Sequence, residues 1–166
     1  MQIINSIVRF FQAIFSIIVL VLSILLARQQ YYGKVPSQTN YAVFTGALGI
    51  IAATVGFASM FIDRLKGIIS WVLDGVTAIA FLAAGIAYAV ALRGTNCDDE
   101  KVGGSTWDNL LISGGCYYDD DGAKWCRDGG VVKKRCTRAT ADAAFMFLAC
   151  IACVGALVSS YITRHR

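Results

Sequence analysis

The stretch from residue 68 to residue 97, IISWVLDGVTAIAFLAAGIAYAVALRGTNC, passes from a long apolar segment into a polar segment that soon reaches a cysteine. A helix needs about 17 to 25 mostly apolar residues to cross the roughly 30 Å of bilayer hydrocarbon. Residues 68–92 meet that requirement and contain one acid, Asp74. We therefore expect a transmembrane helix over 68–92 that leads into a loop outside the membrane.

Three further stretches have the same character: residues 5–27, 41–62 and 139–162. Hydrophobic residues make up 57% of the 166-residue chain, well above the roughly 45–50% of soluble domains. The short connections before the second and third stretches force neighbouring helices to run antiparallel. The sequence therefore predicts an all-α membrane protein, in which residues 1–166 form one antiparallel four-helix bundle. Its large loop, residues 93–138, lies between the third and fourth helices.

The loop carries four cysteines: Cys97, Cys116, Cys126 and Cys136. Their spacing lacks the short Cys-x2-4-Cys pairs of zinc modules. A polar, glycine-rich loop has little core, and oxidising compartments use disulfides to order such segments. We expect two disulfides and an extracytoplasmic loop. Three pairings are possible, and we favour the nested one, Cys97 to Cys136 and Cys116 to Cys126, because the outer cysteines lie at the ends of two helices.

The distribution of Lys and Arg gives the opposite orientation. These residues are more numerous on the side of the loop, and the positive-inside rule taken literally would place the loop in the cytoplasm. The loop's eight bases are matched by eight acids, although the rule does not let acids cancel bases. We give the cysteine chemistry more weight, and so expect both termini in the cytoplasm.

Small residues recur at steps of three and four in the second and third spans. Such residues let membrane helices approach closely, since the hydrophobic effect cannot drive their association in lipid. We therefore expect a tightly packed bundle centre. The positions assigned to this packing are Gly46, Gly49, Ala53, Gly56 and Gly85.

Polar residues in the first span follow one helical face, which includes Arg9 and Gln12. We interpret them as a stripe turned toward the bundle, with a polar conduction path as the alternative. An acid at the depth of Asp74 is costly and is a candidate functional residue. Its candidate partners are Arg9 and Lys66, and both a structural role and a transport role are open. Asp142 is grouped with Asp74, Arg9 and Gln12 as a buried polar packing residue, and because it lies four residues after Arg138 we also expect an interfacial ion pair between the two.

Two further patterns concern the membrane surface. The run Lys133-Lys134-Arg135 is expected to abut the membrane, where it can contact lipid headgroups. Aromatic side chains near the ends of the spans predict an interfacial belt. Its members are Tyr31, Tyr32, Tyr41, Trp71, Tyr88 and Tyr161.

Cys150 and Cys153 form a Cys-x-x-Cys motif within the fourth span. Membrane thiol oxidoreductases that act on quinones carry such a motif in a helix. No Lys, Arg or His lies within three residues to activate a thiol here, and shuttle cysteines are missing from the first connection. We interpret the pair as core thiols. The one histidine, His165, cannot supply a triad or a metal site, so we expect no catalytic residue, no metal and no nucleic-acid partner.

Several local matches indicate a family. They are Leu73-Asp74, the run from Ala84-Gly85 to Arg93 that leads into Cys97, and Arg135-Cys136 followed by Ala139 to Phe145. With the four-span layout and the large loop last, the chain resembles MARVEL-domain tetraspan membrane proteins, and among them the fungal non-classical export protein 2 family associated with eisosomes. The resemblance also supports the pairing of Cys97 with Cys136.

The resemblance implies a non-enzymatic plasma membrane scaffold that self-associates and organises lipids and proteins into eisosome-type, sphingolipid-responsive microdomains, with a link to unconventional export. It implies membrane lipids, further copies of the chain and eisosome-type proteins as partners, and no cofactor beyond bound lipid or sterol. Two alternatives are open: a thiol-quinone oxidoreductase that uses Cys150 and Cys153, and a transporter or channel subunit that uses Asp74.

Overall fold

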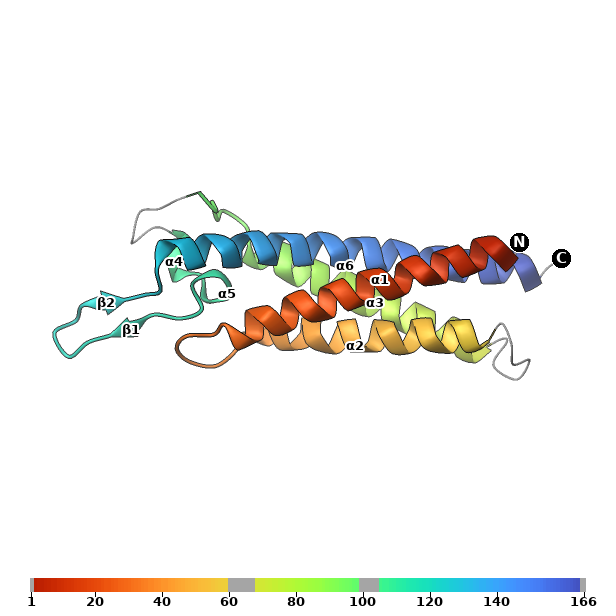
Figure 1. The fold of residues 1–166 in the computed structure, drawn as a ribbon, viewed down its shortest axis with the longest axis horizontal. Coiled ribbons are helices and arrows are strands. Elements are labelled where there is room, and N and C mark those ends of the chain that lie inside the picture. The colour runs from red at the N-terminus through yellow and green to blue at the C-terminus, as the bar shows by residue number, and fades with distance from the viewer. Residues whose placement is uncertain (1, 60–67, 99–104, 165–166) are drawn as a thin grey trace.

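The computed structural model describes residues 2–59, 68–98 and 105–164, and its main feature is a bundle of four long helices (Figure 1). All four are long and apolar enough to cross a membrane. Both chain ends lie at one end of the bundle, and the segment between the third and fourth long helices lies at the other. The predicted four-helix architecture is therefore confirmed. The helices are α1 (Gln2–Arg28), α2 (Ser37–Ala58), α3 (Ile68–Ala91) and α6 (Gly129–Arg164).

Two predicted helix starts differ from the structure. α2 begins at Ser37, directly after Pro36, because proline lacks an N–H and suits the start of a helix. α6 begins at Gly129, ten residues before the predicted start, so the predicted loop 93–138 is wrong over its last part. Residues 129–138 are polar, but they belong to the helix and not to the loop. The predicted end of the second span and the following turn, residues 60–67, lie outside the described residues.

Short elements fill the segment before α6. They are α4 (Ser105–Asp108), α5 (Leu110–Ser113) and a two-stranded antiparallel hairpin of β1 (Tyr117–Tyr118) and β2 (Lys124–Trp125). We call residues 105–138 the cap. The cap has a small core of its own, formed by Trp107, Ile112, Val132 and Cys136. The expectation that this segment has little core is therefore wrong, because the extended start of α6 provides one wall of that core.

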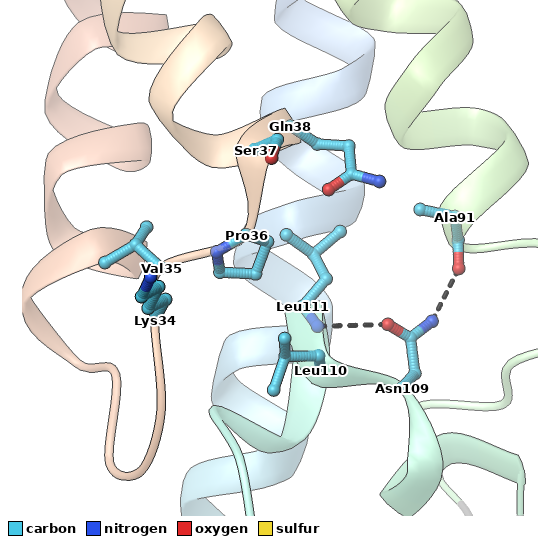
Figure 2. Close-up of a pocket in the computed structure, with 9 residues that line it drawn as sticks. All are labelled: Lys34, Val35, Pro36, Ser37, Gln38, Ala91, Asn109, Leu110 and Leu111. Atoms are coloured by element: carbon cyan, nitrogen blue, oxygen red, sulfur yellow. Dashed lines mark hydrogen bonds between the residues drawn. The ribbon is translucent and has the colours of Figure 1, made fainter.

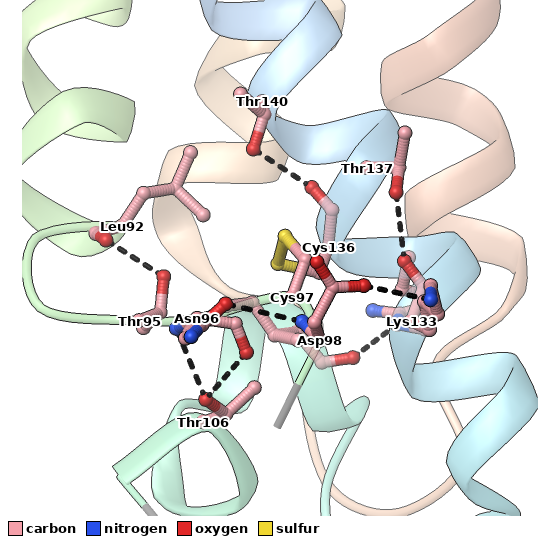
Figure 3. Close-up of a disulfide and its surroundings, with 12 residues drawn as sticks. Leu92, Thr95, Asn96, Cys97, Asp98, Thr106, Lys133, Cys136, Thr137 and Thr140 are labelled. Carbon is pink, nitrogen blue, oxygen red and sulfur yellow. Dashed lines mark hydrogen bonds and ion pairs between the residues drawn. A yellow bond between two sulfur atoms is a disulfide. The ribbon is translucent and has the colours of Figure 1, made fainter. Parts of the chain in front are cut away.

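One disulfide joins the cap to the segment after α3, and a second closes the hairpin within the cap. Cys97 is joined to Cys136 across 39 residues, with Cα atoms 5.5 Å apart, and Cys116 is joined to Cys126 at 4.4 Å. This is the nested pairing favoured from the sequence. Figure 3 shows the outer disulfide between the end of α3 and the start of α6, beside an ion pair of 2.7 Å between Lys133 and Asp98. The hydrogen bond from Lys133 lowers the pKa of Asp98.

The bundle core is closely packed around small residues. A Cβ placed on Gly46 would lie 2.9 Å from the backbone of Leu20 in α1, and one on Gly85 would lie 3.1 Å from the Phe147 ring in α6. Gly49 has Ser16 and Phe81 against it in the same way. These glycines therefore lie where neighbouring helices touch, as the small-residue pattern indicates. Ala53 is also buried.

The belt interpretation fits most of the aromatic residues but not Tyr88. Tyr31, Tyr32, Tyr41, Trp71 and Tyr161 are all exposed on the isolated chain. Tyr88 is fully buried in the bundle core. Its place in the belt is therefore wrong: the side chain faces the other helices, where it meets polar groups described below.

Candidate functional site

A buried ion pair joins the first and third helices. Arg9 of α1 donates from Nη1 to Asp74 Oδ1 of α3 over 2.6 Å, and both side chains are 1% exposed. Arg9 also donates from Nη2 to the Ser70 hydroxyl at 3.0 Å. A charge this deep in a membrane bundle is costly unless it is paired. Of the two candidate partners of Asp74, Arg9 forms the ion pair. Lys66 lies outside the described residues.

Gln12, one turn along α1, extends this ion pair into a network. Its side-chain oxygen accepts from Arg9 Nη1 at 3.2 Å, and its Nε2 donates to Asp74 Oδ1 at 3.2 Å. The same Nε2 lies 3.3 Å from Cys153 Sγ of α6. The network therefore links α1, α3 and α6 through side chains that are all buried.

α2 contributes space to this network. A Cβ placed on Gly56 would overlap the Arg9 guanidinium. A residue with a side chain at position 56 would therefore push Arg9 away from Asp74. All four long helices thus meet at the Arg9–Asp74 pair, three by supplying side chains and one by leaving room.

The site consists of an ion pair surrounded by neutral hydrogen-bonding groups. The carboxylate and the guanidinium neutralise each other, and the hydroxyl and amide around them are ordinary hydrogen-bonding groups. Asp74 Oδ2 and Arg9 Nε have no hydrogen-bond partner among the described residues. No cluster of three or more His, Cys, Asp or Glu that could hold a metal occurs in the part of the chain that the structure describes.

A second group of buried polar side chains lies nearer the cap. Ser23 of α1 donates its hydroxyl to Asp142 Oδ2 of α6 at 2.7 Å. Tyr88 of α3 is adjacent, with Thr39 of α2, Ser23 and Asp142 as its polar neighbours. The predicted ion pair between Asp142 and Arg138 is wrong: Asp142 is fully buried and faces hydroxyl groups. Asp142 therefore lies on the face of α6 that meets α1 and α3.

Arg135 is the residue that the sequence analysis missed. The run Lys133-Lys134-Arg135 was expected at the membrane surface, yet Arg135 is 1% exposed. Its Nε donates to the Ile112 carbonyl (3.0 Å), Nη2 to Leu111 (3.1 Å) and Nη1 to Leu26 (2.9 Å). These carbonyls belong to the last turns of α5 and α1, where helix carbonyls lack partners within the helix. Arg135 thereby fastens the cap to the end of α1.

Replacement of Arg135 by Gln should loosen the cap. Three buried carbonyls would lose their donor, and a buried polar group left without a partner costs about 1–3 kcal/mol. We expect the cap to open locally, with the free energy of unfolding reduced by about 2–3 kcal/mol in detergent unfolding curves. Lys134→Gln is the matched control, because Lys134 is exposed and one residue away. Equal losses from the two variants would contradict the role assigned to Arg135.

The first connection gives the cap a second contact. The Gly114 carbonyl accepts from the N–H groups of Tyr31 (2.8 Å) and Tyr32 (3.1 Å). Gly114 itself has φ of +75°, a conformation that glycine adopts without strain. Arg127 stacks over the Tyr31 ring with 5.3 Å between its Cζ and the ring centroid. The cap and the connection between α1 and α2 therefore form one folded surface outside the spans.

Cys150 and Cys153 are free thiols. Cys153 is buried and bonded by Gln12, and Cys150 is partly buried. Cys136 lies 14 residues before Cys150 and 17 before Cys153 on the same helix, about 21 and 25 Å away at ~1.5 Å rise per residue. The disulfides of the cap are therefore too distant to exchange directly with these thiols.

The outward faces of the spans are almost purely apolar. Exposed aliphatic and aromatic side chains cover α1, α3 and the second half of α6. Examples with at least half of the side chain exposed are Ile7, Phe10, Val76, Ile79, Val90 and Ile151. Because polar groups within the spans point inward and apolar groups outward, the helices present a surface suited to lipid and to other membrane helices.

Comparison with known proteins gave one match. The family model MARVEL, described as a membrane-associating domain, matches residues 2–159. No curated protein and no solved structure matches the chain. The matched range includes all four long helices and the cap, so the buried polar groups described above lie within the matched domain.

Proposed function

Since this chain belongs to the MARVEL family of membrane-associating domains, we propose that it is a non-enzymatic scaffold of the plasma membrane that self-associates and organises lipids and partner proteins. Proteins of this family associate with membranes and act in microdomains, and the family is generally structural. The observation that supports this proposal is the distribution of polar and apolar side chains. Polar side chains such as Arg9, Gln12 and Asp74 bond one another inside the bundle, and large apolar side chains cover its surface.

The orientation within the membrane is part of the proposal. Both disulfides involve cysteines of the cap, and disulfides persist in oxidising compartments. This supports a cap outside the cell and both termini in the cytoplasm. The resemblance to the non-classical export protein 2 family supports the finer proposal, in which the microdomains are eisosome-type, respond to sphingolipids and take part in unconventional export. Partner proteins would then include eisosome-type components.

Self-association is the part of the proposal that is tested most directly. Two copies with different affinity tags are expressed in the same cells, the membranes are solubilised in mild detergent, and one tag is captured. We expect the second tag to be recovered with the first. Cells that each express one tag, mixed after solubilisation, are the control for association in detergent. Recovery no greater than in this mixture would contradict the scaffold.

A further inference from the structure

The polar group around Asp142 contains two atoms that lack partners. Asp142 Oδ1 and the Tyr88 hydroxyl are buried and have no hydrogen-bond partner among the described residues. Both side chains are 0% exposed. A buried polar atom without a partner costs about 1–3 kcal/mol, so a ligand that bonds both atoms would stabilise the folded protein.

The charge of Asp142 has no counter-ion in contact. The groups that face it are hydroxyls: Ser23 from α1, and Tyr88 from α3. Thr39 of α2 adjoins Tyr88. Asp74 differs from Asp142, because Arg9 neutralises it directly.

The nearest basic residues on the same helix do not neutralise Asp142. Arg135 lies two turns before Asp142, and all three of its nitrogens donate to backbone carbonyls. Arg138, one turn before Asp142, is half-buried and forms no ion pair with it among the described contacts. An ionised carboxylate in these surroundings costs several kcal/mol in a bilayer, so the site favours a bound positive charge.

The chemistry of the ligand follows from the donor atoms. The group offers a carboxylate from α6 and three hydroxyls, one each from α1, α2 and α3. Oxygen ligands of this kind suit hard cations rather than soft ones. One carboxylate balances one positive charge, whereas a divalent ion would leave an excess positive charge inside the bundle.

A pocket lies close to this group, on the cap side of the bundle. It has a volume of about 420 Å³ and lies between the start of α2, the end of α3 and α5 (Figure 2). Pro36 and Ala91 are among its lining residues. Pro36 precedes Thr39 by three residues and Ala91 follows Tyr88 by three, and residues three apart are neighbours on a helix surface. The pocket therefore lies one helical turn above the hydroxyl groups.

We propose that Asp142, Tyr88, Ser23 and Thr39 form a site for one monovalent cation, a proton or Na⁺, reached from the cap side of the bundle. The bound cation neutralises Asp142 and occupies the two atoms that lack partners. The unfolded chain offers no such site, so the cation binds only to the folded protein and stabilises it.

Thermal unfolding of the full chain in detergent tests the site. The melting temperature is measured in sodium chloride and in choline chloride at equal ionic strength, each at several pH values. If Na⁺ binds, the melting temperature should rise by about 3–6 °C for each tenfold increase in Na⁺ above its Kd. If a proton binds, Na⁺ has no effect and stability falls as the pH rises, because the folded state holds a proton that the unfolded state releases.

Variants decide whether the effect belongs to this site. Asp142→Asn should abolish the dependence on Na⁺ or on pH, and Asp98→Asn, which changes an exposed acid of the cap side, should leave it intact. Tyr88→Phe and Thr39→Val keep the carboxylate and should weaken a dependence on Na⁺, or shift the pH at which stability falls if a proton binds, which keeps the test valid if Asp142→Asn fails to fold. A wild-type melting temperature insensitive to both cations, or a full response retained in Asp142→Asn, would overturn the proposal.

Discussion

Breaking the Arg9–Asp74 pair from either side should lower the free energy of unfolding by about 3–5 kcal/mol. Asp74→Asn leaves the Arg9 guanidinium buried without a counter-ion, and Arg9→Met leaves the Asp74 carboxylate in the same state. Both side chains are 1% exposed, so water cannot substitute for the missing partner. The change is measured by unfolding in a denaturing detergent, followed by tryptophan fluorescence.

A double variant separates the cost of an unpaired charge from the value of the pair itself. Arg9→Met with Asp74→Leu removes both charges, and replacing a buried ion pair by apolar residues is often neutral. We therefore expect the double variant to recover most of the stability that either single variant loses. Asp98→Asn breaks an exposed ion pair with Lys133 and should cost less than about 1 kcal/mol. A double variant whose loss equals the sum of the single losses would contradict the coupling.

Loss of the outer disulfide should have the next largest effect. Cys97 and Cys136 are 39 residues apart in sequence, and closing a loop of this length in the unfolded chain corresponds to about 4 kcal/mol in the chain-entropy model. Cys116 and Cys126 are 10 residues apart, for which the same model gives about 3 kcal/mol. Paired alanine variants of each disulfide, compared in the same unfolding assay, should show this order.

The inner disulfide serves as the control for the outer one. Both variants remove two cysteines from the same segment, so a general effect of thiol removal would be equal in the two. The outer disulfide also connects α3 to α6, whereas the inner one closes only the hairpin. A larger loss from the inner pair would show that the cap unfolds separately from the bundle.

The spans were predictable because hydrophobic length is a strong signal. A bilayer needs a minimum length of apolar helix, and residues 68–92 satisfied it almost to the residue observed in α3. The pairing of Arg9 with Asp74 was also within reach, since a buried acid near a basic residue of another span has few other partners. The role of Gly56 in making room for Arg9 could not be predicted, because a pattern of glycines does not tell which side chain fills the space.

The cap was less predictable because its order comes from contacts between distant segments. Residues 129–138 are polar, and polarity is typical of loops as well as of helices outside the membrane. Arg135 follows two lysines, and such a run usually lies in solvent. Its burial depends on the free carbonyls of Leu26 and Leu111, which lie far away in sequence. A basic residue one position before a paired cysteine was the only available signal.

Asp142 and Tyr88 were misplaced for a related reason. Both lie near the end of a predicted span, and a position near an end suggests the interface. The helix face decides burial at that depth, and the spacing between Arg138 and Asp142 does not tell which face of α6 meets the other helices. Both side chains point to the centre of the bundle. The position of a residue along its helix does not tell in which direction its side chain points.

The length of α6 sets a fixed height above the bilayer. Its 36 residues span about 54 Å at ~1.5 Å each, against roughly 30 Å of hydrocarbon. If the surplus lies on the cap side, as the polar residues 129–138 suggest, it would hold the hairpin away from the hydrocarbon on a continuous helix. Neighbouring copies would therefore display their hairpins at one common level, so that a flat layer outside the membrane could rest on many copies at once.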